Sequence, residues 1–342
     1  MNIGLIGCGR IAAEHLRIYQ HLKEAKVIAV SDVDFQKAKF FAGQNGIAKV
    51  FDNHERLLEA ANLDFVDVCT PPSAHTNIVC DAAEYGIDVL LEKPMALSTN
   101  DCQKIIHEVE KQGTRLCMCH NQLFFPAILK AKKLVDSGFY DVVSFKTSVK
   151  ENPYLYSVPA WNTSPKEKGI IWEVGCHPAY LQLHFLKDVT EVYAVGNKIK
   201  NPVFDQFSVL LRTSNKTCGI IEVSWLAKET EKIYEFDCAD GKRAFMISPP
   251  PAASRGYETL LERSGIIESG LLSEFRKILR RFVKTETSWG YHIGHFLLIS
   301  SYIQSLIKGS PIPVPSEEGK NTVRLLECIE ESLNKHEAVA FT

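Results

Sequence analysis

A carboxylate and an imidazole, Glu173 and His177, lie four residues apart in the largely apolar segment 169–178. On a helix this spacing puts both side chains on one face, where the carboxylate can orient the ring and raise its basicity. Such a pair suits general acid or base catalysis. The alternative is a surface pair that contributes roughly 0.2–0.5 kcal/mol. The apolar neighbours Ile171 and Trp172 argue against full exposure.

A second candidate for chemistry is Lys93, in Glu92-Lys93-Pro94, directly after the apolar segment Asp88–Leu91. If this segment is a strand of a parallel sheet, Lys93 lies at its carboxyl end, where open α/β sheets bind ligands. Its ammonium group can hydrogen-bond to a substrate oxygen and lower the pKa of an alcohol. The alternative is a solvated salt bridge in a loop.

A glycine-rich turn, Gly7-Cys8-Gly9-Arg10-Ile11-Ala12, has the dinucleotide-binding pattern G-x-G-x-x-A. In this pattern Gly7 makes the tight turn, Gly9 lets the backbone approach a pyrophosphate, and Ala12 permits close packing. The amide groups of the helix that starts at Arg10-Ile11 would face the phosphates. The alternative is a glycine turn in another α/β fold.

An acidic residue, Asp32, ends the next expected strand, twenty residues after Ala12. A carboxylate in this place binds the adenosine ribose hydroxyl groups and repels a 2′-phosphate. No arginine follows it directly, although Lys37 and Lys39 are near enough in sequence to reach it. The sequence therefore favours NAD over NADP.

The loop from Thr70 to His75 follows another expected strand. We expect Thr70, Pro71 and His75 to line the cofactor site together with Glu92 and Lys93. For His75, a surface position in the first turn of the next helix is the alternative.

Alternating strands and helices over the first 120 residues must position these groups, and they predict a parallel sheet covered on both faces. The expected strands are Asn2–Ile6, Lys26–Ser31, Phe65–Thr70, Asp88–Leu91 and Leu116–Cys119. The expected helices are Ile11–Leu22, Phe35–Gln44, Asn53–Ala61, His75–Tyr85 and Ser98–Gln112.

The pattern changes after about residue 120, where consecutive strands with short polar turns predict an antiparallel sheet. The expected strands are Val142–Val149, Glu191–Lys198, Gln206–Arg212, Cys218–Trp225, Lys232–Cys238 and Lys242–Ile247. The expected helices are Phe125–Asp136, Gly169–Phe185, Trp289–Lys308 and Glu317–Lys335.

Taken together, the G-x-G-x-x-A turn, Asp32, Glu92-Lys93-Pro94 and the Glu173–His177 segment resemble the glucose–fructose oxidoreductase / inositol dehydrogenase / MocA (Gfo/Idh/MocA) family. The resemblance covers almost the whole chain. It implies an α/β protein with an N-terminal Rossmann domain, residues 1–120, and a C-terminal α/β domain, residues 121–342, with an open, mostly antiparallel sheet. It also implies that Lys93 and His177 are the catalytic pair, and that Glu173 binds substrate or orients His177.

Three features depart from the pattern of this family. Glu173 stands where many members have aspartate, and Leu123 stands where an arginine is frequent. The stretch 254–288 is predicted to be an insertion, whose segment 271–284 has an apolar stripe and a basic face. Such a helix can bind a membrane or a partner, and we favour packing on its own domain or on a sister subunit. Besides Lys93, Glu173 and His177, the predicted substrate contacts are Asn121 and Trp161.

The composition is ordinary for a globular protein: 342 residues, 45% hydrophobic, 23% charged, with a net charge of −2. This balance does not indicate nucleic-acid binding. No apolar run reaches the roughly 18 residues of a membrane span, and no secretory signal is recognisable. The ten cysteines are scattered, so we expect reduced thiols, a cytoplasmic protein and no metal centre.

The predicted function is therefore NAD-dependent hydride transfer to or from a CHOH group of a sugar, a nucleotide sugar or a cyclitol. The resemblance also predicts a homo-oligomer assembled through the C-terminal sheet. One alternative is a glycosidase that uses NAD for transient oxidation and elimination. Another is a non-enzymatic NAD-binding regulator, against which the presence of both Lys93 and His177 argues.

Overall fold

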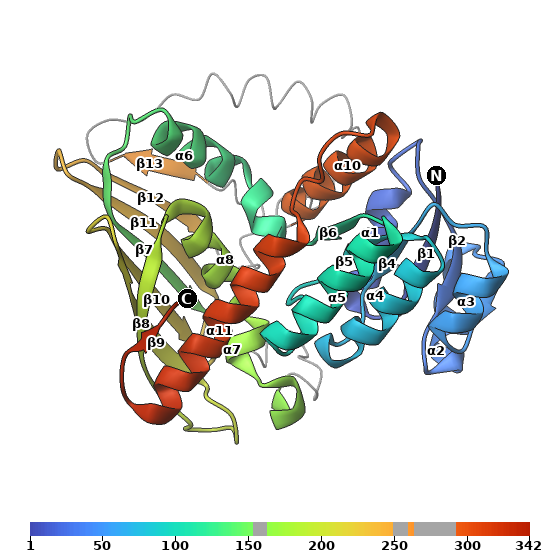
Figure 1. Cartoon of the computed structure of the whole chain (residues 1–342), viewed down its shortest axis with the longest axis horizontal. Helices are drawn as coiled ribbons and strands as arrows, with labels where there is room; N and C mark the ends of the chain where they lie inside the picture. Colours follow the sequence, from blue (N-terminus) through green and yellow to red (C-terminus); the bar gives the residue numbers. More distant parts are fainter. Residues whose placement is uncertain (153–162, 249–258, 263–291) are drawn as a thin grey trace.

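The computed structural model describes residues 1–152, 163–248, 259–262 and 292–342. They form two sheets with helices between them (Figure 1). Trp161 and the basic segment 271–284 lie outside the described residues, so their predicted roles stay predictions.

The first sheet has six parallel strands in the order β3-β2-β1-β4-β5-β6, which confirms the predicted Rossmann architecture. The strands are β1 (Asn2–Ile6), β2 (Lys26–Ser31), β3 (Lys49–Phe51), β4 (Phe65–Val68), β5 (Asp88–Leu91) and β6 (Leu116–Met118). The helices are α1 (Arg10–Tyr19), α2 (Phe35–Asn45), α3 (His54–Ala60), α4 (His75–Glu84) and α5 (Thr99–Gln112). Strand β3 was not predicted, because its three residues are too few to show a pattern.

The second sheet has eight strands in the order β13-β12-β11-β7-β10-β9-β8-β14. They are β7 (Val142–Lys150), β8 (Val189–Asn197), β9 (Gln206–Thr213), β10 (Cys218–Ser224), β11 (Glu231–Cys238), β12 (Arg243–Ser248), β13 (Thr259–Glu262) and β14 (Val339–Ala340). All neighbours are antiparallel except β7 and β10, which confirms a mostly antiparallel sheet. The short strands β13 and β14 were not predicted.

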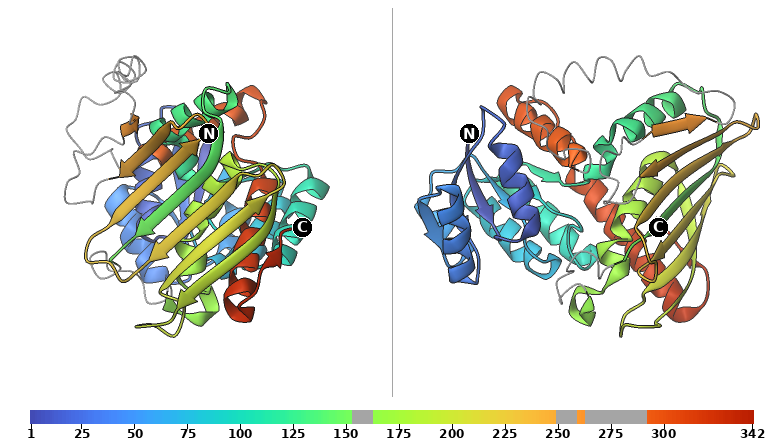
Figure 2. Two further views of the ribbon diagram at one scale, coloured as in Figure 1. Left: turned by 90° about the vertical axis from the view of Figure 1, so that its left-hand side faces the viewer. Right: turned by 180° about the vertical axis from the view of Figure 1, so that it is seen from behind.

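Helices of the second half lie on the side of this sheet that faces the first sheet (Figure 1). They are α6 (Pro126–Asp136), α7 (Ile170–Glu173), α8 (Cys176–Phe185), α10 (Ile293–Lys308) and α11 (Ser316–Lys335). Helix α11 contacts both α5 and β8, and α10 contacts α1, so the C-terminal helices join the two halves. On the opposite face of the sheet, no helix covers the strands within the described residues (Figure 2).

The predicted helix Gly169–Phe185 is wrong in one respect, because the structure divides it into α7 and α8. The backbone ladder becomes irregular at Val174-Gly175. The Gly175 amide reaches the Ile170 carbonyl at 2.9 Å, five residues back, and the His177 amide then bonds to the Val174 carbonyl at 3.1 Å. The i, i+4 face expected for Glu173 and His177 therefore does not form.

The described helices include none that is long and apolar enough to cross a membrane. All ten cysteines are free thiols, as the sequence predicted, and eight of them are buried.

Candidate active site

The turn between β1 and α1 leaves room for a dinucleotide. Gly7 has φ +90°, and a Cβ there would lie 2.6 Å from the Cys69 carbonyl oxygen, so glycine is required. A Cβ on Gly9, by contrast, would meet no described atom within 4 Å. No described side chain caps the start of α1, where Arg10 is exposed, so the amides there remain available to phosphate oxygens. These features fit the NAD that the sequence predicts.

Asp32 lies beside this turn with its carboxylate already engaged. It accepts hydrogen bonds from the Cys8 amide at 2.8 Å and from Lys37 Nζ at 2.7 Å, and its other oxygen accepts one from the Asp34 amide at 3.0 Å. Burial opposes ionisation, but these bonds outweigh it and lower the pKa of Asp32. Asp32 is therefore a carboxylate at neutral pH, partly compensated by Lys37.

His75 is completely buried, which contradicts the surface position considered for it. Its Nδ1 lies 3.0 Å from the Pro94 carbonyl oxygen and its Nε2 lies 2.9 Å from that of Thr70. The ring thus connects the loop after β4 with the loop after β5, because each ring nitrogen faces a different carbonyl. It fixes Thr70, Pro71 and Lys93 relative to one another rather than presenting a free nitrogen to a cofactor.

Lys93 reaches from the end of β5 to the second half of the chain. Its Nζ lies 3.0 Å from the Glu173 backbone oxygen and 3.2 Å from Glu173 Oε2. Burial opposes the charge, but Glu173 and the more distant Cys176 and Glu92 outweigh it and raise the pKa of Lys93. Lys93 is a partly buried, charge-compensated ammonium group.

His177 has a different partner from the one predicted. Its Nδ1 lies 2.8 Å from the Tyr180 hydroxyl oxygen, and the structure shows no hydrogen bond or ion pair between His177 and Glu173, both of which are described. Burial, then Lys93 and then Lys232 lower the pKa of His177 well below its usual value. The imidazole is therefore neutral at pH 7 and able to accept a proton.

Two models of one family match consecutive parts of the chain. The first, described as "Oxidoreductase family, NAD-binding Rossmann fold", matches residues 1–120, and the second, "GFO/IDH/MocA C-terminal domain", matches residues 128–243. This chain belongs to the Gfo/Idh/MocA oxidoreductase family.

Known members of the family resemble the chain over much or all of its length. A D-apiose dehydrogenase from Paraburkholderia graminis is 24% identical over 281 residues, 73% of each chain. A myo-inositol 2-dehydrogenase from Thermotoga maritima is 23% identical and covers 99% of this chain and 98% of its own. The crystal structure of the WlbA dehydrogenase from Bordetella pertussis in complex with NADH and UDP-GlcNAcA superposes with a TM-score of 0.86 at 19% identity, covering 99% and 97% of the two chains. This likeness shows the same fold.

Sequence reasoning missed Tyr180 and Lys232, which are neighbours of His177 in the candidate active site. Lys232 is 4% exposed and lies 3.2 Å from Glu151 through its Nζ. A signal was present for Lys232, because β11 alternates buried and partly exposed positions, and Lys232 falls on the buried side with Tyr234 and Phe236. Tyr180 offered no signal, since its contact depends on where α8 begins after the break.

The predicted substrate contact Asn121 is 6% exposed, and its side chain is engaged on both sides. Its Nδ2 lies 3.2 Å from His295 Nδ1, and its Oδ1 accepts a hydrogen bond of 3.4 Å from the Tyr180 hydroxyl. Leu123, at the position where the family often has arginine, is 5% exposed. The structure therefore places Asn121 behind Tyr180 within a buried network.

Beneath the site, the ligand atoms of His15, Glu92, Cys119 and His295 gather within 4.8 Å of one another. Histidine, cysteine and carboxylate side chains are donors that suit a transition metal. However, His15 lies between two carboxylates, with Nδ1 2.8 Å from Asp67 and Nε2 3.3 Å from Glu92. A protonated His15 between these two anions accounts for the cluster as an ionic network that needs no metal ion.

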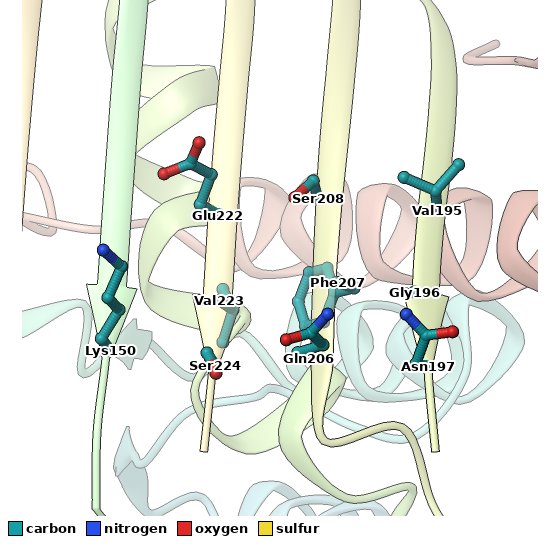
Figure 3. Close-up of a pocket in the computed structure, with 10 residues that line it drawn as sticks. All are labelled: Lys150, Val195, Gly196, Asn197, Gln206, Phe207, Ser208, Glu222, Val223 and Ser224. Atoms are coloured by element: carbon teal, nitrogen blue, oxygen red, sulfur yellow. The ribbon is translucent and has the colours of Figure 1, made fainter. Parts of the chain in front are cut away.

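A hollow of about 460 Å³ lies across β7, β10, β9 and β8 (Figure 3). Its lining includes Lys150, Val195, Ser208 and Glu222, at outward positions of the sheet, and none of the predicted site residues. Lys93, Glu173 and His177 lie on the other side, toward the first sheet. The hollow is therefore separate from the candidate active site.

Proposed function

We propose that this protein is an NAD-dependent oxidoreductase that transfers a hydride between nicotinamide and a CHOH group of a sugar, a nucleotide sugar or a cyclitol. Membership of the family supports the reaction class. The observation that carries the proposal is a pair of partly buried side chains, one a hydrogen-bond donor and the other a proton acceptor. Lys93 is an ammonium donor held by Glu173, and His177 is an imidazole whose low pKa keeps it neutral.

In this proposal the chain's own residues manage the proton and the oxygen of the substrate. When bound, NAD supplies the carbon that accepts or donates the hydride. His177 takes the hydroxyl proton during oxidation on the ring nitrogen that does not contact Tyr180. Lys93 donates a hydrogen bond to the same oxygen and stabilises the negative charge that develops there. Glu173 holds the Lys93 ammonium group in place.

We propose NAD rather than NADP as the preferred coenzyme. The Asp32 carboxylate lies beside the nucleotide turn, where it repels a 2′-phosphate and accepts hydrogen bonds from ribose hydroxyl groups. Lys37 offsets part of this charge, since its Nζ lies 2.7 Å from Asp32. The preference is therefore expected to be clear but not absolute.

The names of relatives suggest the substrate class. They include dehydrogenases of D-apiose and myo-inositol and a structure that contains UDP-GlcNAcA. Each of these compounds offers a secondary alcohol on a ring or on a sugar. We therefore expect a polyhydroxylated substrate with at least one such alcohol.

We also propose a homo-oligomer that forms through the outer face of the second sheet. This face exposes large apolar side chains, and no described helix covers it (Figure 2). The exposed side chains are Val143, Tyr193, Val195 and Leu210. Ten free cysteines suit a reducing compartment, so we place the protein in the cytoplasm.

The proposed reaction can be tested with panels of sugars, cyclitols and UDP-sugars supplied with NAD⁺, while NADH is followed by its absorbance. We expect NADH to form with at least one member of a panel, in proportion to the substrate consumed. Aryl glycosides, assayed in parallel, should release no phenol. Phenol release without net NADH would instead support the glycosidase, and a tightly bound nucleotide with neither product would support a regulator.

A further inference from the structure

His177 can act as a base only if one particular nitrogen keeps its lone pair. A neutral imidazole carries one proton, on Nδ1 or on Nε2, and its partners decide which. Nδ1 faces the Tyr180 hydroxyl at 2.8 Å. If Tyr180 donates to Nδ1, then Nε2 carries the proton and cannot accept another. If Nδ1 donates to Tyr180, then Nε2 is free to accept the proton of a substrate.

The contacts of the Tyr180 hydroxyl decide between these cases. Its oxygen accepts a hydrogen bond from the Gln122 amide at 3.2 Å, and its single proton is directed to Asn121 Oδ1 at 3.4 Å. Turning that proton toward His177 would leave the buried Asn121 oxygen without a donor, which costs roughly 1–3 kcal/mol. The Tyr180 oxygen is thus an acceptor toward His177.

The orientation of Asn121 is in turn decided by an anion. Its Nδ2 donates to His295 Nδ1 at 3.2 Å, which leaves the His295 proton on Nε2, 3.7 Å from Glu92 Oε1. Rotating the amide by 180° would exchange its oxygen and nitrogen and place a His295 lone pair opposite the Glu92 carboxylate. Electrostatic repulsion between this lone pair and the Glu92 carboxylate opposes that arrangement.

We infer that Tyr180 is a positioning residue that holds His177 with its proton on Nδ1 and the lone pair on Nε2. The Glu92 carboxylate sets the direction of this chain of hydrogen bonds, because it keeps the His295 proton on Nε2. The bonds from Asn121 to His295, from Tyr180 to Asn121 and from His177 to Tyr180 then each have one direction. Glu92 also accepts a bond from the Lys93 amide at 3.1 Å, so one network connects both predicted catalytic residues. The catalytic purpose of this arrangement rests on the proposed function, whereas the tautomer itself does not.

The tautomer can be read directly from two-bond ¹H–¹⁵N spectra of the histidine rings in the full-length protein at neutral pH, with His177→Gln used to assign the signal. We expect a proton on Nδ1 in the wild type and a population with the proton on Nε2 in Tyr180→Phe. Tyr234→Phe is the matched control, because the Tyr234 hydroxyl donates to Gln122 Oε1 at 2.8 Å. It should leave the His177 signals unchanged.

Activity gives a second readout. In Tyr180→Phe we expect kcat/KM to fall between about 10-fold and 100-fold, less than loss of the base itself, with NADH affinity retained. If Tyr180→Phe does not fold, Asn121→Leu replaces it, since it frees the Tyr180 proton to turn toward His177 and should produce the same Nε2 signal.

A wild-type His177 with its proton on Nε2 would overturn the inference, and so would a variant that keeps the proton wholly on Nδ1. These spectra require no substrate. Failure of the proposed reaction in the substrate panel would therefore be distinguishable from failure of this inference.

Discussion

Two histidines in this protein, the fully buried His15 and the partly buried His177, have opposite charge states. His15 lies between Asp67 and Glu92 beneath the first sheet's loops, and His177 lies near Lys93 and Lys232 on the second half of the chain. Burial opposes protonation of both rings. At His15 the carboxylate of Asp67, together with Cys69 and Cys119, outweighs burial and raises the pKa well above its usual value, whereas at His177 the lysines act with burial and lower the pKa.

The comparison shows that neighbouring charges, and not burial alone, assign the two rings their roles. His15 is a fixed cation that neutralises two anions, which suits a structural role. His177 is a neutral base next to a permanent cation, which suits proton transfer. The predictions below test this division by changing the neighbours that create it.

The largest effect is expected from Lys93→Met. This change removes the ammonium donor proposed to stabilise the substrate oxygen, so turnover should fall by roughly 10² to 10⁴ with NADH binding retained. It also removes one of the cations that lower the pKa of His177. Steady-state kinetics measure turnover and fluorescence titration measures NADH binding, with the exposed Lys104→Met as the control. Turnover within a factor of three of wild type would exclude Lys93 from the chemistry.

At the histidine that lies between two carboxylates, His15→Gln should lower the free energy of unfolding. Removing the cation leaves Asp67 and Glu92 as buried carboxylates without their shared partner, which costs about 3–5 kcal/mol. Urea unfolding of His15→Gln and His177→Gln side by side would measure the difference. We expect the second variant to lose much less stability, because a neutral ring balances no charge. Equal losses would mean that His15 does not neutralise these carboxylates.

A smaller effect is expected from Glu173→Gln. The Lys93 ammonium loses a carboxylate at 3.2 Å but keeps the backbone oxygen of residue 173 at 3.0 Å, so its position should largely persist. We predict a fall in kcat/KM of about 10-fold, well below the effect of losing an acid or base. A loss as large as that of Lys93→Met would show that Glu173 takes a direct part in the reaction.

An effect of similar size is expected at the nucleotide site. Asp32→Ala removes the carboxylate that disfavours a 2′-phosphate and leaves Lys37, which can attract one. The preference for NADH over NADPH should therefore narrow, by about 10-fold or 1.4 kcal/mol. Fluorescence titration of both coenzymes measures this change. Equal affinities in the wild type would contradict the role assigned to Asp32.

The sequence predicted the nucleotide turn but not the surroundings of His177, and the difference has a physical reason. The nucleotide turn was predictable because its function depends on backbone conformation within six consecutive residues, and β2 was predicted with its observed bounds. The surroundings of His177 were not, because the break at Val174-Gly175 replaced the expected partner with Tyr180. The burial of His75 likewise depends on a loop nineteen residues away, at Pro94. Contacts between distant segments leave no periodic signal.

The neutral charge state of His177 is the central claim, and the pH dependence of kcat/KM tests it most directly. The base must be unprotonated during oxidation. Activity is therefore present above the pKa of His177 in the folded protein and is lost as the pH falls through that pKa. Because that pKa lies well below 6.5, we predict that wild-type activity persists through pH 6.5 and falls only in more acidic solution. In His177→Gln the residual activity should be lower by roughly 10² to 10⁴ and should lack this limb. A wild-type limb at or above pH 6.5, or the same limb in the variant, would contradict the account.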